Sequence, residues 1–210
     1  MRSLDQLYPL AEPQGGYFTA AQAAQAGVNR QLLSYHSRPG GGLIRIRPGL
    51  YRILRFPAAP HEATMAAWLS VGAGVVSHES ALEILELSDV IPDEVHLTVS
   101  RVLRGRRRRP GVRLHTPAAQ LPRSQVWKRA GLPVTSAARS IVDAASTGAA
   151  PEQVELAVRQ ALARGLTTPA ELRRLARGRS ARVQRLVGAA LLRPGREEPP
   201  PVRPSLKPRA

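Results

Sequence analysis

The stretch Leu43-Ile44-Arg45-Ile46-Arg47-Pro48-Gly49-Leu50-Tyr51-Arg52-Ile53-Leu54 decides the expected fold. Apolar and basic residues alternate on both sides of Pro48-Gly49, a pair typical of tight turns, so the pattern predicts two strands joined by a turn. The alternation places the isoleucines on a packed side and Arg45, Arg47 and Arg52 on an exposed side. A hairpin with three exposed arginines is suited to contact with the phosphates of DNA. The alternative is that these charges only keep an exposed edge strand soluble.

Three short helices are expected before this hairpin. The second begins after Thr19, which has capping-box spacing with Gln22, and the third begins after Asn29, a favoured N-cap residue. The turn between these two helices is short and contains Gly27, as a helix-turn-helix motif requires. Three helices followed by a hairpin predict a winged helix-turn-helix DNA-binding domain at residues 1–57.

The third helix carries the residues most informative about function. Gln31, Ser34, Tyr35 and Arg38 follow helical spacing and form one polar face, with Arg30 beside it. Arginine and glutamine side chains can pair with guanine and adenine edges in the major groove, so the four residues of this face are the predicted base-reading set, and Arg30 is predicted to bind DNA with them. An ordinary solvated helix face is the alternative, and the basic hairpin directly after the helix favours DNA.

The centre of the chain predicts a mixed α/β region. The segments 95–99 and 112–115 alternate between apolar and polar residues like strands. Seven arginines lie at 101–113, without the interleaved aromatic residues that single-strand binding uses. Five of them are predicted to contact phosphates or an acidic partner unless they belong to a solvated loop, namely Arg104, Arg106, Arg107, Arg108 and Arg109.

The part that follows predicts helices and then a tail. Ser136 can cap a helix over about 137–146, and Thr168 has the surroundings of a strong helix start. Residues 193–210 are rich in proline and arginine and have little to bury, so we expect a disordered tail. The expected fold class is therefore α+β, with the winged helix followed by a mixed α/β and then helical domain at 58–192.

Composition narrows the classes of function. The 210 residues include 31 Lys and Arg but only 15 Asp and Glu, a net charge of +16, which predicts a polyanionic partner, first double-stranded DNA and then an anionic membrane. The absence of cysteine excludes disulfides and thiolate metal sites and fits a reducing compartment. No apolar run approaches 18 residues, so we expect no transmembrane helix. We expect DNA and not a membrane as the partner, and a cytoplasmic location.

Signals for catalysis are weak. The sequence holds no G-x-S-x-G, Walker A or H-E-x-x-H motif. No pair of histidines has metal-ligand spacing, so we expect neither a metal site nor a cofactor; they are His36, His61, His78, His96 and His115. Ser77 is interpreted as a helix N-cap. Two alternatives to a DNA-binding regulator stay open: a degenerate nuclease using Glu79, Asp89 or Asp93, and a basic protein-interaction module without operator preference.

Several segments resemble a known family. They are Gly16-Tyr17-Phe18-Thr19-Ala20-Ala21-Gln22-Ala23, the hairpin at 43–52, Val76-Ser77-His78-Glu79-Ser80-Ala81-Leu82, Glu94-Val95-His96-Leu97-Thr98-Val99 and the segment 131–143. Over about residues 1–190 the chain resembles the actinobacterial AbiEi-type antitoxins of type IV toxin–antitoxin systems. The resemblance implies a non-enzymatic autorepressor that binds an inverted repeat upstream of its operon and counteracts a nucleotidyltransferase toxin. It also implies that the third helix reads bases while the hairpin arginines hold the DNA backbone.

Overall fold

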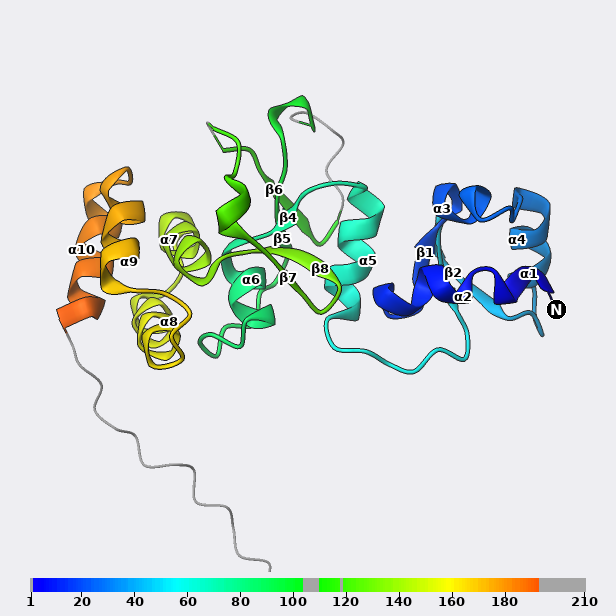
Figure 1. Ribbon diagram of the computed structural model, residues 1–210, viewed down its shortest axis with the longest axis horizontal. Helices are drawn as coiled ribbons and strands as arrows, with labels where there is room; N and C mark the ends of the chain where they lie inside the picture. The colour runs from blue at the N-terminus through cyan, green and yellow to red at the C-terminus, as the bar shows by residue number, and fades with distance from the viewer. Residues whose placement is uncertain (1, 104–109, 118, 193–210) are drawn as a thin grey trace, which may run out of the picture.

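The computed structural model describes residues 2–103, 110–117 and 119–192 (Figure 1). It confirms the predicted α+β class, with helices and a small antiparallel sheet at the N-terminal end, a second sheet in the middle and helices at the C-terminal end. In the described part of the chain, every helix is too short or too polar to cross a membrane. The predicted tail and five of the predicted arginine contacts, at 104 and 106–109, lie outside the described residues.

The N-terminal region contains more elements than the sequence predicts. The expected first helix is split in two, and a short strand precedes the second expected helix. The elements are α1 (Arg2–Asp5), α2 (Tyr8–Ala11), η1 (Glu12–Gln14), β1 (Tyr17–Thr19), α3 (Ala20–Gln25), α4 (Arg30–His36), β2 (Leu43–Arg47) and β3 (Leu50–Ile53). The sheet order is β1-β3-β2, with both pairs antiparallel.

The local signals for helix starts and the hairpin turn are confirmed. The Thr19 hydroxyl accepts a hydrogen bond from the Gln22 N–H, and the Gln22 side chain accepts one from the Thr19 N–H, so the capping box is complete. The Asn29 side chain accepts a hydrogen bond from the Leu32 N–H at 2.9 Å. Gly49 has a φ of 79°, a left-handed conformation that glycine adopts without strain.

The predicted alternation of side chains is wrong for β2. Leu43 pairs with Ile53 and both are buried, whereas Ile44 and Ile46 are each 38% exposed. A bulge follows Arg45 and shifts the register of the hairpin. Since residues opposite one another in a sheet share a face, pairing with Ile53 puts Leu43 in the core and turns Ile44 away from it.

The N-terminal sheet packs on both of its faces. On one face, Phe18 stacks on Tyr51 with ring centroids 5.8 Å apart, and Leu33 of α4 joins them in a small core. On the other face, Tyr17 and Leu50 belong to the larger core that fills the rest of the molecule. The boundary expected near residue 57 is thus crossed by packed side chains, and the two-domain division stays a prediction.

The larger core surrounds a five-stranded sheet with the order β6-β5-β4-β8-β7. Strands β4 and β8, and β5 and β6, run parallel, while β4 and β5, and β7 and β8, run antiparallel. The elements of this region are α5 (Glu62–Val71), β4 (Val75–Val76), α6 (His78–Ile84), β5 (Val95–Thr98), η2 (Arg101–Leu103), β6 (Val112–His115), η3 (Arg123–Gln125), β7 (Val126–Arg129) and β8 (Leu132–Thr135).

The turn between β7 and β8 touches the N-terminal region. Its two residues, Ala130 and Gly131, have φ values of 47° and 75°. A Cβ atom on Gly131 would lie 2.2 Å from the backbone oxygen of Pro13, so only glycine allows this approach. The turn therefore helps to hold η1 against the central sheet.

Replacing Gly131 by alanine is expected to lower the free energy of unfolding by about 2 kcal/mol, because backbone strain adds to the clash with Pro13. Urea denaturation of the full chain measures this loss. Gly165→Ala is the matched control, since Gly165 also has a positive φ, 63°, but no atom lies within 4 Å of its added Cβ. The control should lose only about 1 kcal/mol. Equal losses for the two variants would show that the turn does not press against η1.

The C-terminal helices pack around a buried acid. They are α7 (Ala137–Thr147), α8 (Pro151–Ala163), α9 (Pro169–Arg177) and α10 (Ala181–Leu192). Asp143 of α7 is 2% exposed and accepts hydrogen bonds from Arg139 and Arg179, at 2.6 and 2.5 Å. Because Arg179 follows α9, this ion pair ties α9 to α7. Thr168 caps α9 as predicted, by accepting from the Glu171 N–H.

Two predicted helix caps are wrong. The Ser136 side chain makes no capping bond to α7, and its buried hydroxyl has no partner within the described part of the chain. The Ser77 side chain does not cap α6 either, since its oxygen accepts a hydrogen bond from Thr98 and shares another with His78. Both serines precede a helix, but their side chains point into the protein.

Candidate nucleic-acid interface

The DNA-contacting residues predicted on and just after α4 share one exposed surface. Helix α4 lies at the outer end of the N-terminal region, away from the central sheet (Figure 1). All five predicted side chains on or after it are exposed, and Tyr35 is the most apolar of them at 63% exposure. The set is Arg30, Gln31, Ser34, Tyr35 and Arg38.

The opposite face of α4 anchors the helix. Leu33 is completely buried in the small core, next to Val28 from the turn before the helix. The Ser37 hydroxyl donates to the Leu33 carbonyl at 2.7 Å and ends the helix. Arg38 therefore lies just beyond the last helical residue, although its N–H still bonds to the Tyr35 carbonyl at 3.3 Å. A rigid short helix with a polar outer face is suited to insertion into a major groove.

The three hairpin arginines have different surroundings. Arg45 is exposed and Arg47 is half-buried, so both guanidinium groups are available near the β2–β3 turn. Arg52 instead points inward: its Nη2 lies 2.7 Å from a carboxylate oxygen of Glu62, and its guanidinium lies over the Tyr17 ring. The Arg52 guanidinium, predicted to hold the DNA backbone, thus makes its contacts within the protein.

The Arg52 pair links the hairpin to α5. Arg52 also donates to the carbonyls of Phe56 and Pro57, and the Tyr17 hydroxyl donates to Glu62 at 3.3 Å. A hydrogen bond from the Ala59 N–H, together with the neighbouring Arg52, lowers the pKa of Glu62. The carboxylate is therefore ionised near neutral pH and holds the hairpin in a fixed position relative to the central region.

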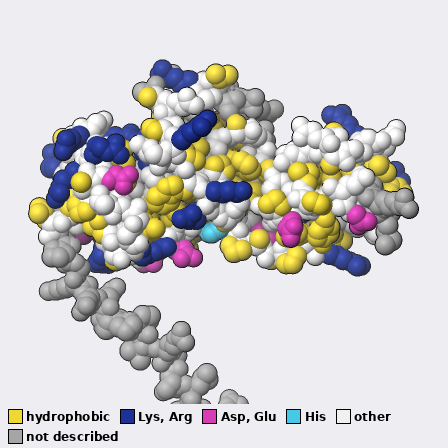
Figure 2. All heavy atoms as spheres, in the orientation of Figure 1, with side chains coloured by type: hydrophobic (Ala, Val, Ile, Leu, Met, Phe, Trp, Pro, Cys, Tyr) yellow, Lys and Arg dark blue, Asp and Glu magenta, His cyan; other side chains and the backbone are white. Residues whose placement is uncertain are grey.

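A second basic surface was not predicted. Helices α9 and α10 expose five arginines, and Figure 2 shows dark-blue side chains gathered on these helices at the left. They are Arg173, Arg174, Arg177, Arg182 and Arg185. Their spacing was visible in the sequence as the polar side of amphipathic helices. At the edge of the central sheet, Arg101 and Arg113 of the predicted arginine cluster are also exposed.

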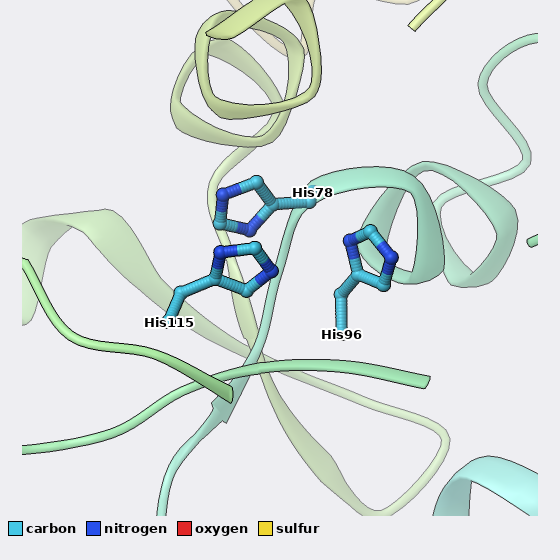
Figure 3. Close-up of side chains that lie close together, drawn as sticks. All are labelled: His78, His96 and His115. Atoms are coloured by element: carbon cyan, nitrogen blue, oxygen red, sulfur yellow. The ribbon is translucent and has the colours of Figure 1, made fainter. Parts of the chain in front are cut away.

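The structure also brings three histidines together, contrary to the expectation from their spacing. His78, His96 and His115 each offer a ring nitrogen, and these three atoms lie within 4.8 Å of one another (Figure 3). The His78 and His115 rings are stacked with centroids 3.6 Å apart. The spacing argument failed because it considered one helix or loop at a time, while these residues come from one helix and two strands.

Burial keeps these histidines neutral. Burial, aided by the neighbouring His115 and His96, lowers the pKa of His78 to about 2. Burial also lowers the pKa of His115 to about 4 and shifts that of His96 in the same direction. At neutral pH each ring therefore has one N–H donor and one free lone pair.

The acids proposed for a nuclease do not form such a group. Asp89 and Asp93 are exposed, and Glu79 lies 3.9 Å from His96. Among the described residues, the three histidines are the only cluster of three or more potential metal ligands. Glu79, Asp89 and Asp93 are not members of this cluster.

Comparisons with known proteins agree with the N-terminal geometry. Residues 5–54 match the family model described as a transcriptional regulator, AbiEi antitoxin, which confirms the resemblance for the segment from the last residue of α1 to the end of the hairpin. The RV2827C protein from Mycobacterium tuberculosis has a similar crystal structure, with a TM-score of 0.58 and 16% identity, over 91% of this chain and 76% of that chain. That likeness is one of fold. A search of curated proteins found no match.

Proposed function

We propose that this protein is a sequence-specific DNA-binding transcriptional regulator of the antitoxin type. In this proposal α3, α4 and the β2–β3 hairpin act as a winged helix-turn-helix. The observation that carries it is the exposed polar face of α4, anchored by buried Leu33 and followed by a basic hairpin. The match of residues 5–54 to the AbiEi antitoxin model supports the same function.

In this proposal α4 and the hairpin make different kinds of contact with DNA. Gln31 and Arg38 contact base edges in the major groove and supply specificity. Arg45 and Arg47 contact phosphates beside it and supply affinity that does not depend on sequence. The regulated site is an inverted repeat upstream of the protein's own operon, and the regulator acts as an autorepressor. The region after residue 57 is proposed to bind a nucleotidyltransferase toxin.

Arg38→Ala is expected to weaken binding to the upstream site by roughly 10-fold and to leave binding to a scrambled duplex nearly unchanged, because it removes a base-edge contact. Arg47→Ala should weaken binding to both duplexes by similar factors, because phosphate contacts are blind to sequence. Fluorescence anisotropy with both labelled duplexes measures the four ratios.

Arg123→Ala is the control, since Arg123 is an exposed arginine of η3 outside the proposed surface. It should bind both duplexes like the unmodified chain. If Arg38→Ala and Arg47→Ala lose the same factor on both duplexes, α4 does not read bases and the assignment of roles is wrong.

A further inference from the structure

We propose that His78, His96 and His115 form a binding site for one Zn²⁺ ion per chain. The site lies within the central region and is separate from the proposed DNA surface on α4 (Figures 1 and 3). Three neutral imidazoles are a donor set that zinc accepts, with a fourth position left for water or another small ligand. The proposal does not depend on the protein being a DNA-binding regulator.

The sheet topology is what makes the three rings converge. His115 pairs with Thr98 across the parallel strands β5 and β6, and His96 lies two residues before Thr98, so both histidines stand on the same face of the sheet. His78 is the first residue of α6, directly after Ser77, which extends the neighbouring strand β4 by donating its N–H to the His96 carbonyl at 3.0 Å. The sheet thus fixes the backbones of His96 and His115, and it fixes the residue just before His78.

The backbone of His78 is strained in a way that serves this convergence. Its φ is 56°, a left-handed conformation that is strained for a non-glycine residue. Because His78 is also the first residue of α6, this conformation directs its ring toward the two strands, as Figure 3 shows. Strain of this kind persists where surrounding structure enforces it, and it is concentrated at functional sites.

Two ring nitrogens of the cluster are left without a hydrogen-bond partner in the described part of the chain. Nδ1 of His96 and Nε2 of His115 are both buried, and neither has a hydrogen-bond partner among the described residues. A buried polar atom without a partner destabilises the folded protein, because it has lost its hydrogen bonds to water. Two such atoms within one cluster are expensive for a purely structural core, and a metal ion would satisfy both through their lone pairs.

Neighbouring groups can orient the ligands. The Thr98 hydroxyl donates to Ser77 Oγ at 2.8 Å, and Ser77 Oγ shares a hydrogen bond of 2.9 Å with His78 Nδ1. On the far side of His96, its Nε2 lies 3.9 Å from a Glu79 carboxylate oxygen. If His96 binds metal through Nδ1, its Nε2–H faces Glu79, which is the carboxylate–histidine–metal arrangement common at zinc sites.

Metal binding requires a local rearrangement. Nitrogens on a tetrahedral zinc ion are about 3.3 Å apart, so ligand atoms spread over 4.8 Å must close by rotation of the side chains. The stacked rings of His78 and His115 direct their in-plane lone pairs side by side, and this stack must open for both to reach one ion. We therefore expect zinc to change the ring environments without refolding the sheet.

The charge around the cluster sets the strength of binding. Arg113 lies close enough to His96 and His115 to oppose their protonation, and Arg139 and Arg179 do the same to His78. Positive charge also opposes a bound cation, although Asp143 neutralises part of it by pairing with Arg139 and Arg179. An anionic fourth ligand such as hydroxide is consequently favoured over neutral water.

The test uses the full chain without an affinity tag, freed of metal by chelation and then dialysed. With Zn²⁺ at about 100 times its dissociation constant, the melting temperature should rise by roughly 5–10 °C, and elemental analysis after desalting should find one zinc per chain. Co²⁺ as a spectroscopic probe should give the visible absorption of tetrahedral coordination.

Three variants locate the ion: His78→Gln, His96→Gln and His115→Gln. Each should lose at least 10-fold in zinc affinity and lose the zinc-dependent rise in melting temperature, measured against its own metal-free form. This internal reference keeps the test valid if a variant is less stable. His61→Gln, which alters a histidine outside the cluster, should bind zinc like the unmodified chain. Less than one zinc per chain with an unchanged melting temperature, or affinity unaffected by all three cluster variants, would overturn the proposal.

Discussion

Replacing Asp143 by alanine is expected to lower the free energy of unfolding by about 3–5 kcal/mol, because it removes one partner from a buried charge network. Asp143 is 2% exposed, and its two oxygens accept hydrogen bonds from Arg139 and Arg179. Without the carboxylate, the Arg139 side chain, 14% exposed, keeps its charge in a poorly hydrated position. Helix α9 also loses its tie to α7.

Urea denaturation followed by circular dichroism measures this loss. Asp143→Asn keeps the shape and one acceptor oxygen, so it should lose less than Asp143→Ala. Asp89→Ala removes an exposed acid and should change the free energy of unfolding by less than about 0.5 kcal/mol. A loss below about 1 kcal/mol for Asp143→Ala would mean that the ion pairs do not hold the C-terminal helices together.

DNA affinity is expected to fall roughly 100-fold between 50 and 200 mM salt. The proposed surface offers Arg30, Arg45 and Arg47 to phosphates, and the exposed arginines elsewhere add to the attraction. Neutralising about four phosphates gives a slope of log K against log salt concentration of roughly −3.6. Arg52 makes no contribution to this estimate, since it is paired with Glu62.

The slope is measured by anisotropy titrations at several salt concentrations. Arg47→Ala should reduce its magnitude by about 1, as expected for one lost phosphate contact, while Arg123→Ala should leave it unchanged. A slope near zero would exclude nucleic acid as the partner. An acidic protein would then be the expected partner of the positively charged surface.

Local sequence signals predicted the N-terminal region well. The capping box of Thr19, the N-cap at Asn29 and the turn at Pro48-Gly49 depend on neighbouring residues only, and all three occur in the structure. Predictions from the same kind of signal were wrong where a side chain forms a hydrogen bond with a residue far away in the sequence. Ser77 has the sequence context of a helix cap, but its hydroxyl bonds to Thr98 on another strand.

Features that depend on tertiary pairing could not be predicted from the sequence. Strand β4 has only two residues, and its pairing with β5 and β8 is what forms it. The Arg52 side chain points inward because it pairs with Glu62. The three histidines meet because of how three different elements are placed next to one another. The α4 surface was predictable because a single amphipathic helix defines it.

We propose that this protein recognises a DNA sequence through α4. The most direct measurement is the ratio of the dissociation constants of the full chain for a scrambled duplex and for the upstream region of its own operon, at about 150 mM salt. We predict that this ratio is at least about 1,000, as for other specific regulators, and that it falls about 10-fold for Arg38→Ala. Equal affinity for the two duplexes, with no other preferred site found by selection from random DNA, would contradict it.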